Sequence, residues 1–258
     1  MLRKLNLFRK SPTESDVEVS ESRGVRSLYL GSRTVQSSMN LADPYALVLD
    51  YTKAMMSFLL FHNRVRSVAC VGLGGASIPK FIWKMLPEIN ICVVENSQKV
   101  INVARHYFFL PDDDARLSVI HADGTAWVDG AGKHDIIMLD AFDGSGVPGG
   151  FTDEEFIQKV KNHLTDQGIY MQNLWSNDPQ LKFRINQIEA IFDQIALIPT
   201  PKGGNIVALA FCKAPSSAHM SNITNLSRDL KRSTGLDFDD MVRRMRSFQS
   251  SQTKKLFT

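Results

Sequence analysis

The sequence predicts an α/β fold in which helices cover both faces of a doubly wound, mostly parallel sheet of seven strands. Apolar, strand-like runs alternate with helical segments over residues 67–212, a pattern typical of parallel sheets that are buried on both faces. A glycine-rich turn, Gly72-Leu73-Gly74-Gly75, directly follows the first of these strands. Ligands of such sheets bind beyond the carboxyl ends of the strands, near the point where the strand order reverses. The functional site is therefore expected at these strand ends.

The composition is that of an ordinary globular chain, with 43% hydrophobic and 22% charged residues among 258. The net charge of +3 is too small to indicate a nucleic-acid partner, and no apolar run reaches the roughly 20 residues that cross a membrane. Cys70, Cys92 and Cys212 lie in strand-like runs without the spacing of a zinc site or a redox pair. These features predict a cytoplasmic protein that has reduced thiols, binds no metal and has no membrane or nucleic-acid partner.

Two segments precede the predicted sheet. Residues 1–24 are polar, charged and Ser-rich, which predicts a flexible N-terminal segment. Residues 25–62 are expected to lead into the sheet as a hairpin and a helix. Residues 25–36 alternate in the manner of a β-hairpin that turns at Gly31-Ser32, and residues 44–62 carry apolar side chains at helical spacing.

The main domain is expected over residues 63–214. Its strands are predicted at residues 67–71, 91–95, 117–120, 135–139, 168–174, 195–198 and 205–212. Its helices are predicted at residues 79–86, 98–108, 152–164 and 179–192. Ser97 is suited to cap the second of these helices, because its hydroxyl can accept a hydrogen bond from a backbone N–H of the first turn. Thr152 and Glu155 have the spacing of a capping box at the start of the third.

Residues 215–258 are predicted to form a basic helical tail. Residues 216–258 hold eight Lys and Arg against four Asp and Glu. Within residues 237–248, one helical face is apolar and consists of Phe238, Met241, Val242, Met245 and Phe248. This pattern predicts an amphipathic helix that docks on the domain or on a second subunit. A role at a membrane surface or a nucleic acid is the alternative, but three arginines support it only weakly.

The first two strand ends carry a nucleotide-binding pattern. Gly72 and Gly74 allow the backbone to turn sharply and to approach a ligand closely, and the helix that follows presents free N–H groups. Glu95 ends the second strand, where a carboxylate can accept hydrogen bonds from both hydroxyls of a ribose. These features fit NAD, FAD or adenosylmethionine alike. A tight turn without a ligand and a surface carboxylate are the plain structural alternatives.

The next two strand ends favour group transfer from an adenosyl sulfonium compound. Asp123 can accept a hydrogen bond from the adenine amino group, and Gly124 leaves room for the ring. Asp140 ends an apolar strand and is expected to point into the cleft, where desolvation makes its carboxylate a suitable base. Asp143 adds a second anion, which suits a substrate with ammonium groups. An ordinary Asp-Gly turn and solvated loop charges are the structural alternatives, and no residue constellation for hydride transfer is recognisable.

On these motifs, residues 25–212 resemble the spermidine synthase family of polyamine aminopropyltransferases, which implies a Rossmann-like methyltransferase fold. Residues 29–36 resemble the family's segment that ends in a cofactor-contacting glutamine, and residues 140–143 resemble its Asp-Ser-Ser-Asp loop. The resemblance implies that the cofactor is held by Gln36, Gly72, Gly74, Gly75, Glu95, Asp123 and Gly124. It implies Asp140 as the catalytic base. The substrate-binding residues that it implies are Tyr45, Asp143 and Gln172.

The sequence departs from the family pattern in three places. Gly75 stands where the family commonly has an Asp, which resembles the anchor for the amino end of decarboxylated adenosylmethionine. Ala46 follows Tyr45 where the family often has His, and the N-terminal β-domain is reduced to one predicted hairpin. The cofactor is therefore expected to be either decarboxylated adenosylmethionine or adenosylmethionine itself.

Three functions follow from this pattern. The first is aminopropyl transfer to a small-molecule amine, a polyamine, with Asp140 as base. The second is methyl transfer from adenosylmethionine in the same cleft, which Gly75 favours. The third is a cofactor-binding protein without turnover, against which the pair Asp140 and Asp143 argues. The resemblance also implies a homodimer.

Overall fold

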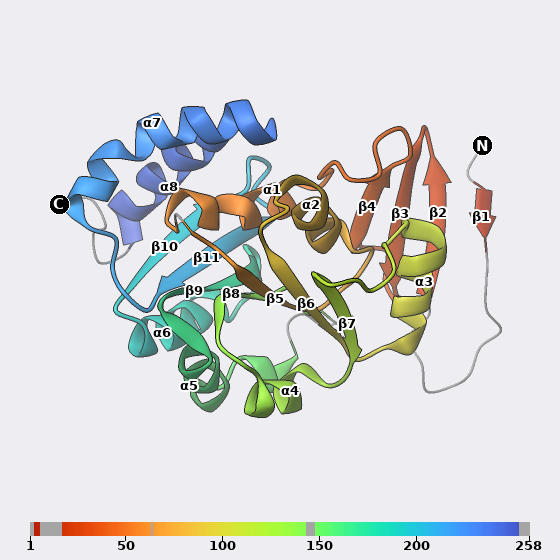
Figure 1. The fold of residues 1–258 in the computed structure, drawn as a ribbon, viewed down its shortest axis with the longest axis horizontal. Helices are drawn as coiled ribbons and strands as arrows, with labels where there is room; N and C mark the ends of the chain where they lie inside the picture. The colour runs from red at the N-terminus through yellow and green to blue at the C-terminus, as the bar shows by residue number, and fades with distance from the viewer. Residues whose placement is uncertain (1–2, 6–16, 63, 143–147, 253–258) are drawn as a thin grey trace.

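The computed structural model describes residues 3–5, 17–62, 64–142 and 148–252. Two β-sheets lie side by side, and helices pack against the larger one (Figure 1). The N-terminal sheet is antiparallel throughout and has the order β1-β2-β3-β4. Its strands are β1 (Arg3–Leu5), β2 (Val17–Ser22), β3 (Val25–Leu30) and β4 (Ser37–Asn40).

The N-terminal sheet is larger than the predicted hairpin. The chain does turn after β3, but the return strand is β4, which lies beyond residues 25–36. The prediction of a flexible segment over residues 1–24 was wrong for β2, which pairs with β3 and buries Val17 and Val19. A short strand with two buried side chains does not stand out from a polar, Ser-rich composition, because its stability comes from the neighbouring strand and not from its own residues.

The larger sheet has the predicted seven strands and confirms the predicted doubly wound fold. Its order is β10-β11-β9-β8-β5-β6-β7. The parallel strands are β5 (Ser67–Val71), β6 (Asn90–Glu95), β7 (Leu117–His121), β8 (His134–Leu139) and β9 (Leu164–Trp175). Strand β11 (Asn205–Phe211) runs antiparallel to both of its neighbours, β9 and β10 (Gln194–Pro199), so β10 has the same direction as β9. The strand order reverses between β5 and β8, so the ends of these two strands flank the switch point at which ligands bind.

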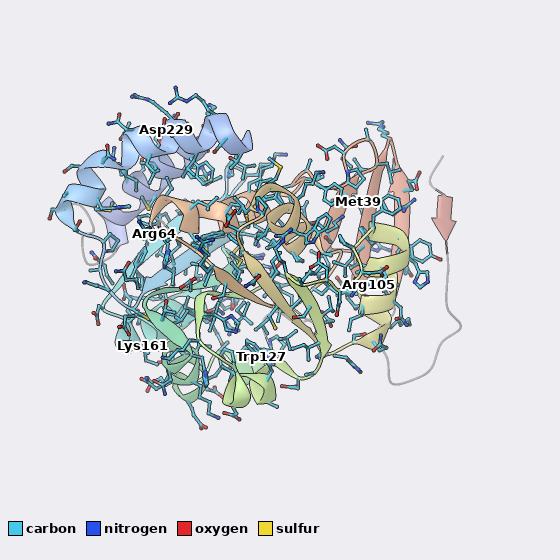
Figure 2. All side chains as sticks on the ribbon, in the orientation of Figure 1. Met39, Arg64, Arg105, Trp127, Lys161 and Asp229 are labelled. Atoms are coloured by element: carbon cyan, nitrogen blue, oxygen red, sulfur yellow. The ribbon has the colours of Figure 1, made fainter. Side chains whose placement is uncertain are left out.

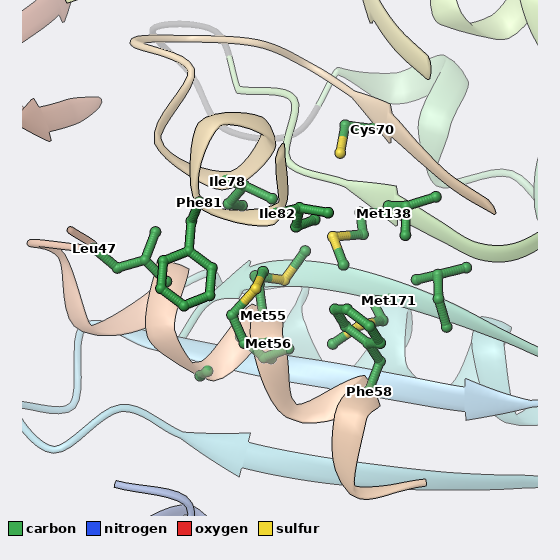
Figure 3. Packing of buried hydrophobic residues seen from close by; sticks show 14 of the residues in the cluster. Leu47, Met55, Met56, Phe58, Cys70, Ile78, Phe81, Ile82, Met138 and Met171 are labelled. Carbon is green, nitrogen blue, oxygen red and sulfur yellow. The ribbon is translucent and has the colours of Figure 1, made fainter. Parts of the chain in front are cut away.

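Helices cover both faces of this sheet. One face is covered by α1 (Asp50–Ala54), the 3₁₀ helix η1 (Met55–Leu60), α2 (Ser77–Met85), α3 (Gln98–Phe108), α7 (Ser217–Thr234) and α8 (Phe238–Gln252). The other is covered by α4 (Gly124–Gly130), the 3₁₀ helix η2 (Gly149–Phe151), α5 (Glu154–Asn162) and α6 (Leu181–Ile191). Figure 3 shows Met55 and Phe58 of η1 packed near Met138 and Met171 of the sheet.

Two helix starts differ from the prediction because local side chains compete for the backbone. The helix expected over residues 44–62 begins only at Asp50, since Asn40 and Asp43 accept hydrogen bonds from backbone N–H groups two residues ahead and form turns instead. The predicted capping box is absent at α5: the hydroxyl of Thr152 donates to the Gly149 carbonyl, and the helix begins after Asp153. The cap at Ser97 is confirmed by its bond from Val100 N at 3.3 Å.

The tail docks on the domain, as the apolar face of residues 237–248 predicts. Phe238, Met241 and Met245 are buried, and α8 packs against α7 and β10 (Figure 1). Arg244 of α8 donates a hydrogen bond to the carbonyl of Pro199 in β10. In the described part of the chain, no helix has the length and apolar character that crossing a membrane requires.

Contacts at α2 and α3 fix the N-terminal sheet beside the larger one. Side chains fill the space between the two sheets, and Met39 of β4 is labelled there (Figure 2). The ammonium group of the buried Lys80 lies 3.2 Å from the sulfur of Met39 and donates to the carbonyls of Pro44 and Phe108. Burial lowers the pKa of Lys80 to about 8. These bonds tie β4 and the loop that follows it to α2 and to the end of α3.

Candidate active site

A cleft lies at the carboxyl ends of β5, β6 and β8, as predicted. Its walls come from the end of β3, the loop before β4, α1, the glycine turn after β5 and the start of α4. We refer to this hollow as the cleft. Six of the predicted site residues line it: Gln36, Gly72, Gly74, Glu95, Gly124 and Asp140. Of the other predicted residues, Asp143 lies outside the described residues.

Gly72 allows the glycine turn to meet the end of β8. Its φ is +99°, a conformation that other residues rarely adopt, and a Cβ atom at this position would lie 2.8 Å from the backbone carbonyl carbon of Asp140. The backbone N–H of Asp140 donates to the Val71 carbonyl at 2.9 Å. A side chain at position 72 would therefore clash with the backbone of Asp140, whether or not a ligand is bound.

Glu95 links the end of β6 to the glycine turn. Its carboxylate is 8% exposed and accepts hydrogen bonds from the backbone N–H groups of Leu73 at 3.0 Å and Ser97 at 2.9 Å. Burial raises the pKa of Glu95, while the N–H groups of Leu73, Ser97 and Asn96 and the charge of His121 act in the opposite direction. Each carboxylate oxygen has a further lone pair, so the same group can hold the turn and accept hydrogen bonds from a ligand.

Gly75 does not face open space, although it belongs to the glycine turn. A Cβ atom at position 75 would lie 2.7 Å from Ser37 Oγ and 2.9 Å from the ring of Phe108. Ser37 lines the cleft, and its hydroxyl lies 3.1 Å from that of Ser77. The place expected for a side chain at position 75 is therefore taken by Ser37 and the ring of Phe108, with the hydroxyl of Ser77 next to that of Ser37.

Asp140 lies half-buried at the floor of the cleft. Asn173 Nδ2 donates a hydrogen bond of 2.9 Å to Asp140 Oδ1, and the Tyr51 hydroxyl also bonds to this carboxylate. Burial raises the pKa of Asp140 to about 6, although both hydrogen bonds act to lower it. A carboxyl with this pKa is largely ionised at neutral pH and still basic enough to hold a proton during a reaction.

Tyr51, and not Tyr45, is the tyrosine of the cleft. The ring of Tyr45 stacks on Trp83, with centroids 6.1 Å apart, and Tyr45 does not line the cleft. Tyr51 lies six residues further along the chain, in the first turn of α1. Its hydroxyl lies 3.2 Å from the Gln36 carbonyl and also interacts with Asp140, so its single proton can serve either acceptor. Burial raises the pKa of Tyr51 well above 10, with Asp140 adding to the shift, so the hydroxyl keeps its proton.

Asn173, and not the neighbouring Gln172, lies beside Asp140. Side chains alternate between the two faces along β9. Gln172, which is 2% exposed, points to the face of α5 and α6 and accepts a hydrogen bond from the Tyr170 hydroxyl. Asn173, also 2% exposed, points to the face on which Asp140 lies. Gln172 does not line the cleft, and a contact between Gln172 and the substrate stays a prediction.

Asp123 caps α4 beside the cleft. Its Oδ1 accepts hydrogen bonds from the backbone N–H groups of Thr125 at 2.7 Å and Ala126 at 3.3 Å. The hydroxyl of Thr125 contributes most to a lowered pKa. The neighbouring Gly124 lines the cleft, and a Cβ atom there would lie 2.5 Å from Val71. The turn expected as the structural alternative is present, and the lack of a side chain at Gly124 leaves room for Val71 and the ring of Phe151.

An aromatic pair extends the cleft wall next to Asp140. Phe142 lines the cleft and stacks on Trp175, with centroids 5.1 Å apart and ring planes 8° from parallel. Phe142 stands at a serine position of the loop that the sequence resembles. The wall combines an apolar surface with a π-face, which attracts the methylene groups and the ammonium groups of an amine.

The residues of the cleft fit an adenosyl compound. The side-chain nitrogen of Gln36 is buried beside the glycine turn and has no hydrogen-bond partner within the described residues. A buried donor without a partner costs free energy unless a ligand satisfies it. Glu95 supplies acceptors for hydroxyls. Fold and cleft together are those of a transferase with the Rossmann-like fold of adenosylmethionine-dependent enzymes.

Comparisons with known proteins agree with this class and narrow it. The spermine/spermidine synthase domain matches residues 46–218. A polyamine aminopropyltransferase of Chromobacterium violaceum is 35% identical over 233 residues, which are 90% of this chain and 89% of the relative. An eEF1A lysine and N-terminal methyltransferase of Xenopus laevis is 28% identical over 229 residues, 79% of this chain and 32% of that protein. The chain belongs to the spermine/spermidine synthase family and is a transferase of that family.

The fold of a solved family structure is also shared. A crystal structure of spermidine synthase in complex with the transition-state analogue AdoDATO superimposes with a TM-score of 0.74 at 16% identity. The match covers 95% of this chain and 87% of the other. It confirms that the seven-stranded sheet and its helices have the arrangement of an adenosylmethionine-dependent transferase.

Proposed function

We propose that this protein transfers an aminopropyl group from decarboxylated adenosylmethionine to an amine of a polyamine, with Asp140 as the base. The observation that carries the proposal is the carboxylate of Asp140, which lies between the expected nucleoside contacts and the aromatic wall and has a pKa of about 6. Membership of a polyamine aminopropyltransferase family supports the same activity.

The nucleoside end of the donor is assigned to the glycine turn and its neighbours. Glu95 accepts hydrogen bonds from the ribose, Gln36 donates its side-chain N–H, and Gly124 with Asp123 receives the adenine. The donor supplies a carbon activated by the sulfonium and departs as methylthioadenosine. These residues orient the donor, and such alignment of the reacting atoms accounts for much of the rate of a displacement reaction.

The acceptor end is assigned to Asp140 and the residues around it. A substrate ammonium gives a proton to the Asp140 carboxylate, and the neutral amine then carries the lone pair that forms the new C–N bond. Tyr51 and Asn173 hold the carboxylate, and Phe142 faces the methylene chain of the amine. Asp143 remains a proposed contact for a second ammonium group.

Methyl transfer from adenosylmethionine is the second candidate, and one feature of the cleft favours it. The position beside Gly75 holds the hydroxyls of Ser37 and Ser77 and no carboxylate. A neutral pair tolerates the carboxylate of adenosylmethionine, whereas an aspartate repels it. The similarity to a protein named as a lysine and N-terminal methyltransferase is consistent with this alternative.

The proposal also covers the cellular location and the oligomeric state of the enzyme. The free thiols Cys70, Cys92 and Cys212 accord with a reducing, cytoplasmic location. A homodimer is proposed on the family resemblance, and sedimentation analysis of the purified protein tests it.

Turnover with each donor tests the proposed function. The purified protein is incubated with a polyamine such as putrescine and either decarboxylated adenosylmethionine or adenosylmethionine. We expect release of methylthioadenosine from the decarboxylated donor and little adenosylhomocysteine from the other. Adenosylhomocysteine as the main product would establish the second candidate. Tight binding of both donors without any product would contradict both, and an Asp140→Asn variant controls for contaminating activity.

A further inference from the structure

A pair of asparagine side chains connects Asp140 to the start of β11. Asn173 Nδ2 donates to Asp140 Oδ1 at 2.9 Å, and Asn205 Nδ2 donates to Asn173 Oδ1 at 3.0 Å. Asn205 begins β11 and lies diagonally across the antiparallel pair from Asn173, which is opposite Val207. The three side chains therefore share one face of the sheet.

The chemistry of the groups fixes the direction of both bonds. An ionised carboxylate only accepts hydrogen bonds, so Asn173 must turn its NH₂ group toward Asp140. Its carbonyl oxygen then faces Asn205, which has to present a donor. An amide has nearly the same shape after a rotation of 180°, so without this second partner nothing but the carboxylate itself opposes the rotated form, which would place the carbonyl oxygen against the carboxylate. Asn205 excludes that orientation.

Asn205 is itself held firmly. The buried Thr200 exchanges hydrogen bonds with its backbone: Thr200 N donates to the Asn205 carbonyl at 2.9 Å, and Asn205 N donates to Thr200 Oγ1 at 3.1 Å. These bonds close the turn between β10 and β11. The donor that orients Asn173 thus comes from a rigid part of the fold and not from a loop of the cleft.

We propose that Asn205 is a positioning residue for the base: it locks the Asn173 amide in the orientation that donates to Asp140 and so keeps that carboxylate ionised and in place. The inference rests on the proposed function only in naming Asp140 the base. Among the described residues, the titratable groups that interact with Asp140 are the Tyr51 hydroxyl and the Cys70 thiol. Burial raises the pKa of both, so both are neutral near pH 7. The amide is therefore a principal stabiliser of the charged form.

Two substitutions at Asn205 separate the effect on orientation from the loss of a side chain. Asn205→Asp keeps the shape but replaces the donor with an acceptor, which turns the Asn173 amide around. Asn205→Ala removes the donor and leaves the amide free to rotate. We expect the pKa of Asp140 to rise by about 1–2 in Asn205→Asp and by less than about 1 in Asn205→Ala, since a hydrogen bond to a charged group is worth roughly that much. Asn225→Asp is the matched control, because it breaks an amide–amide bond of 3.1 Å on the exposed face of α7.

The pKa is measured by carbon NMR of protein labelled at the aspartate carboxyl groups, with Asp140→Asn to assign the signal. The acid limb of the kcat profile is measured on the same proteins, together with KM for the donor. In Asn205→Asp we expect a higher pKa of Asp140 and a shift of the acid limb of the kcat profile to higher pH. We expect KM for the donor to stay unchanged. An Asp140 pKa equal to that of the parent in both variants overturns the inference, even if Asp140→Asn is inactive. A raised pKa with an unmoved rate profile supports the positioning and shows instead that Asp140 is not the base.

Discussion

Replacing Asp140 with asparagine is expected to stabilise the folded protein at neutral pH. The carboxyl has a pKa of 3.8 in an unfolded chain and about 6 in the fold, because burial disfavours its charge. Between these two values the folded state binds more protons than the unfolded state, so the free energy of unfolding falls as the pH rises. The difference corresponds to about 3 kcal/mol at and above pH 7. Asparagine carries no charge and avoids this cost.

The cleft can accept the amide without a new unsatisfied group. The amide oxygen takes the bond from Asn173, and the amide nitrogen donates to the oxygen of Tyr51. The single proton of Tyr51 then points to the Gln36 carbonyl, which lies 3.2 Å away. A comparison of the parent protein with the Asp140→Asn variant therefore measures the effect of the Asp140 charge on stability.

Urea unfolding of parent and variant at pH values from 4 to 8 tests this expectation. Other titrating groups contribute equally to both proteins and cancel in the difference. The stability advantage of Asp140→Asn should be small at pH 4 and grow by about 2–3 kcal/mol by pH 7. A difference that does not change with pH, or that shrinks as the pH rises, would show that the folded state does not disfavour the charge of Asp140.

Three further predictions concern the donor and the base. Glu95→Ala should weaken the binding of methylthioadenosine by about 1–3 kcal/mol in calorimetry, because the ribose loses a charged acceptor; an unchanged affinity contradicts the ribose contact. Gly75→Asp alone should lower the melting temperature, since its Cβ meets Ser37 Oγ at 2.7 Å. Combined with Ser37→Gly, it should shift the affinity ratio at least about tenfold toward decarboxylated adenosylmethionine, and an unmoved ratio would show that position 75 does not act on the donor. Tyr51→Phe should move the acid limb of kcat upward, because Asp140 loses one of its two side-chain donors; an unshifted limb would refute that role.

The sheet and four of its strand ends could be predicted because their signals are local. A glycine turn after an apolar run, and a carboxylate at the end of another, are visible in the sequence itself. Gly72, Glu95, Gly124 and Asp140 lie far apart in the chain, yet they meet in the cleft because the carboxyl ends of parallel strands lie at one edge of a sheet. The covering strands β2 and β4 depend on pairing with β3, which no local pattern reveals.

The choice between Gln172 and Asn173 could not be made from the sequence, for a physical reason. β9 lies inside the sheet and is buried on both faces, so Ile169, Tyr170 and Met171 are all apolar. A strand of this kind shows no hydrophobic alternation, so its own sequence does not reveal which residues point to which face of the sheet. The same holds for Tyr51, whose place over Asp140 depends on the turns that delay the start of α1.

The surroundings of Asp140 are unlike those of two other carboxylates that the fold holds partly buried. Asp178 is paired with Arg184 at 2.6 Å and Asp240 with Arg244 at 2.6 Å. Burial acts to raise both pKa values, but the hydrogen bonds and arginine charges outweigh it and leave both lowered. Asp140 has neutral donors and, in the described part of the chain, no ion pair with a lysine or arginine. A fold that only needed to satisfy this carboxylate would gain by pairing it with a cation. The absence of such a partner leaves the carboxylate available for a cation that arrives from solution, as a substrate ammonium does.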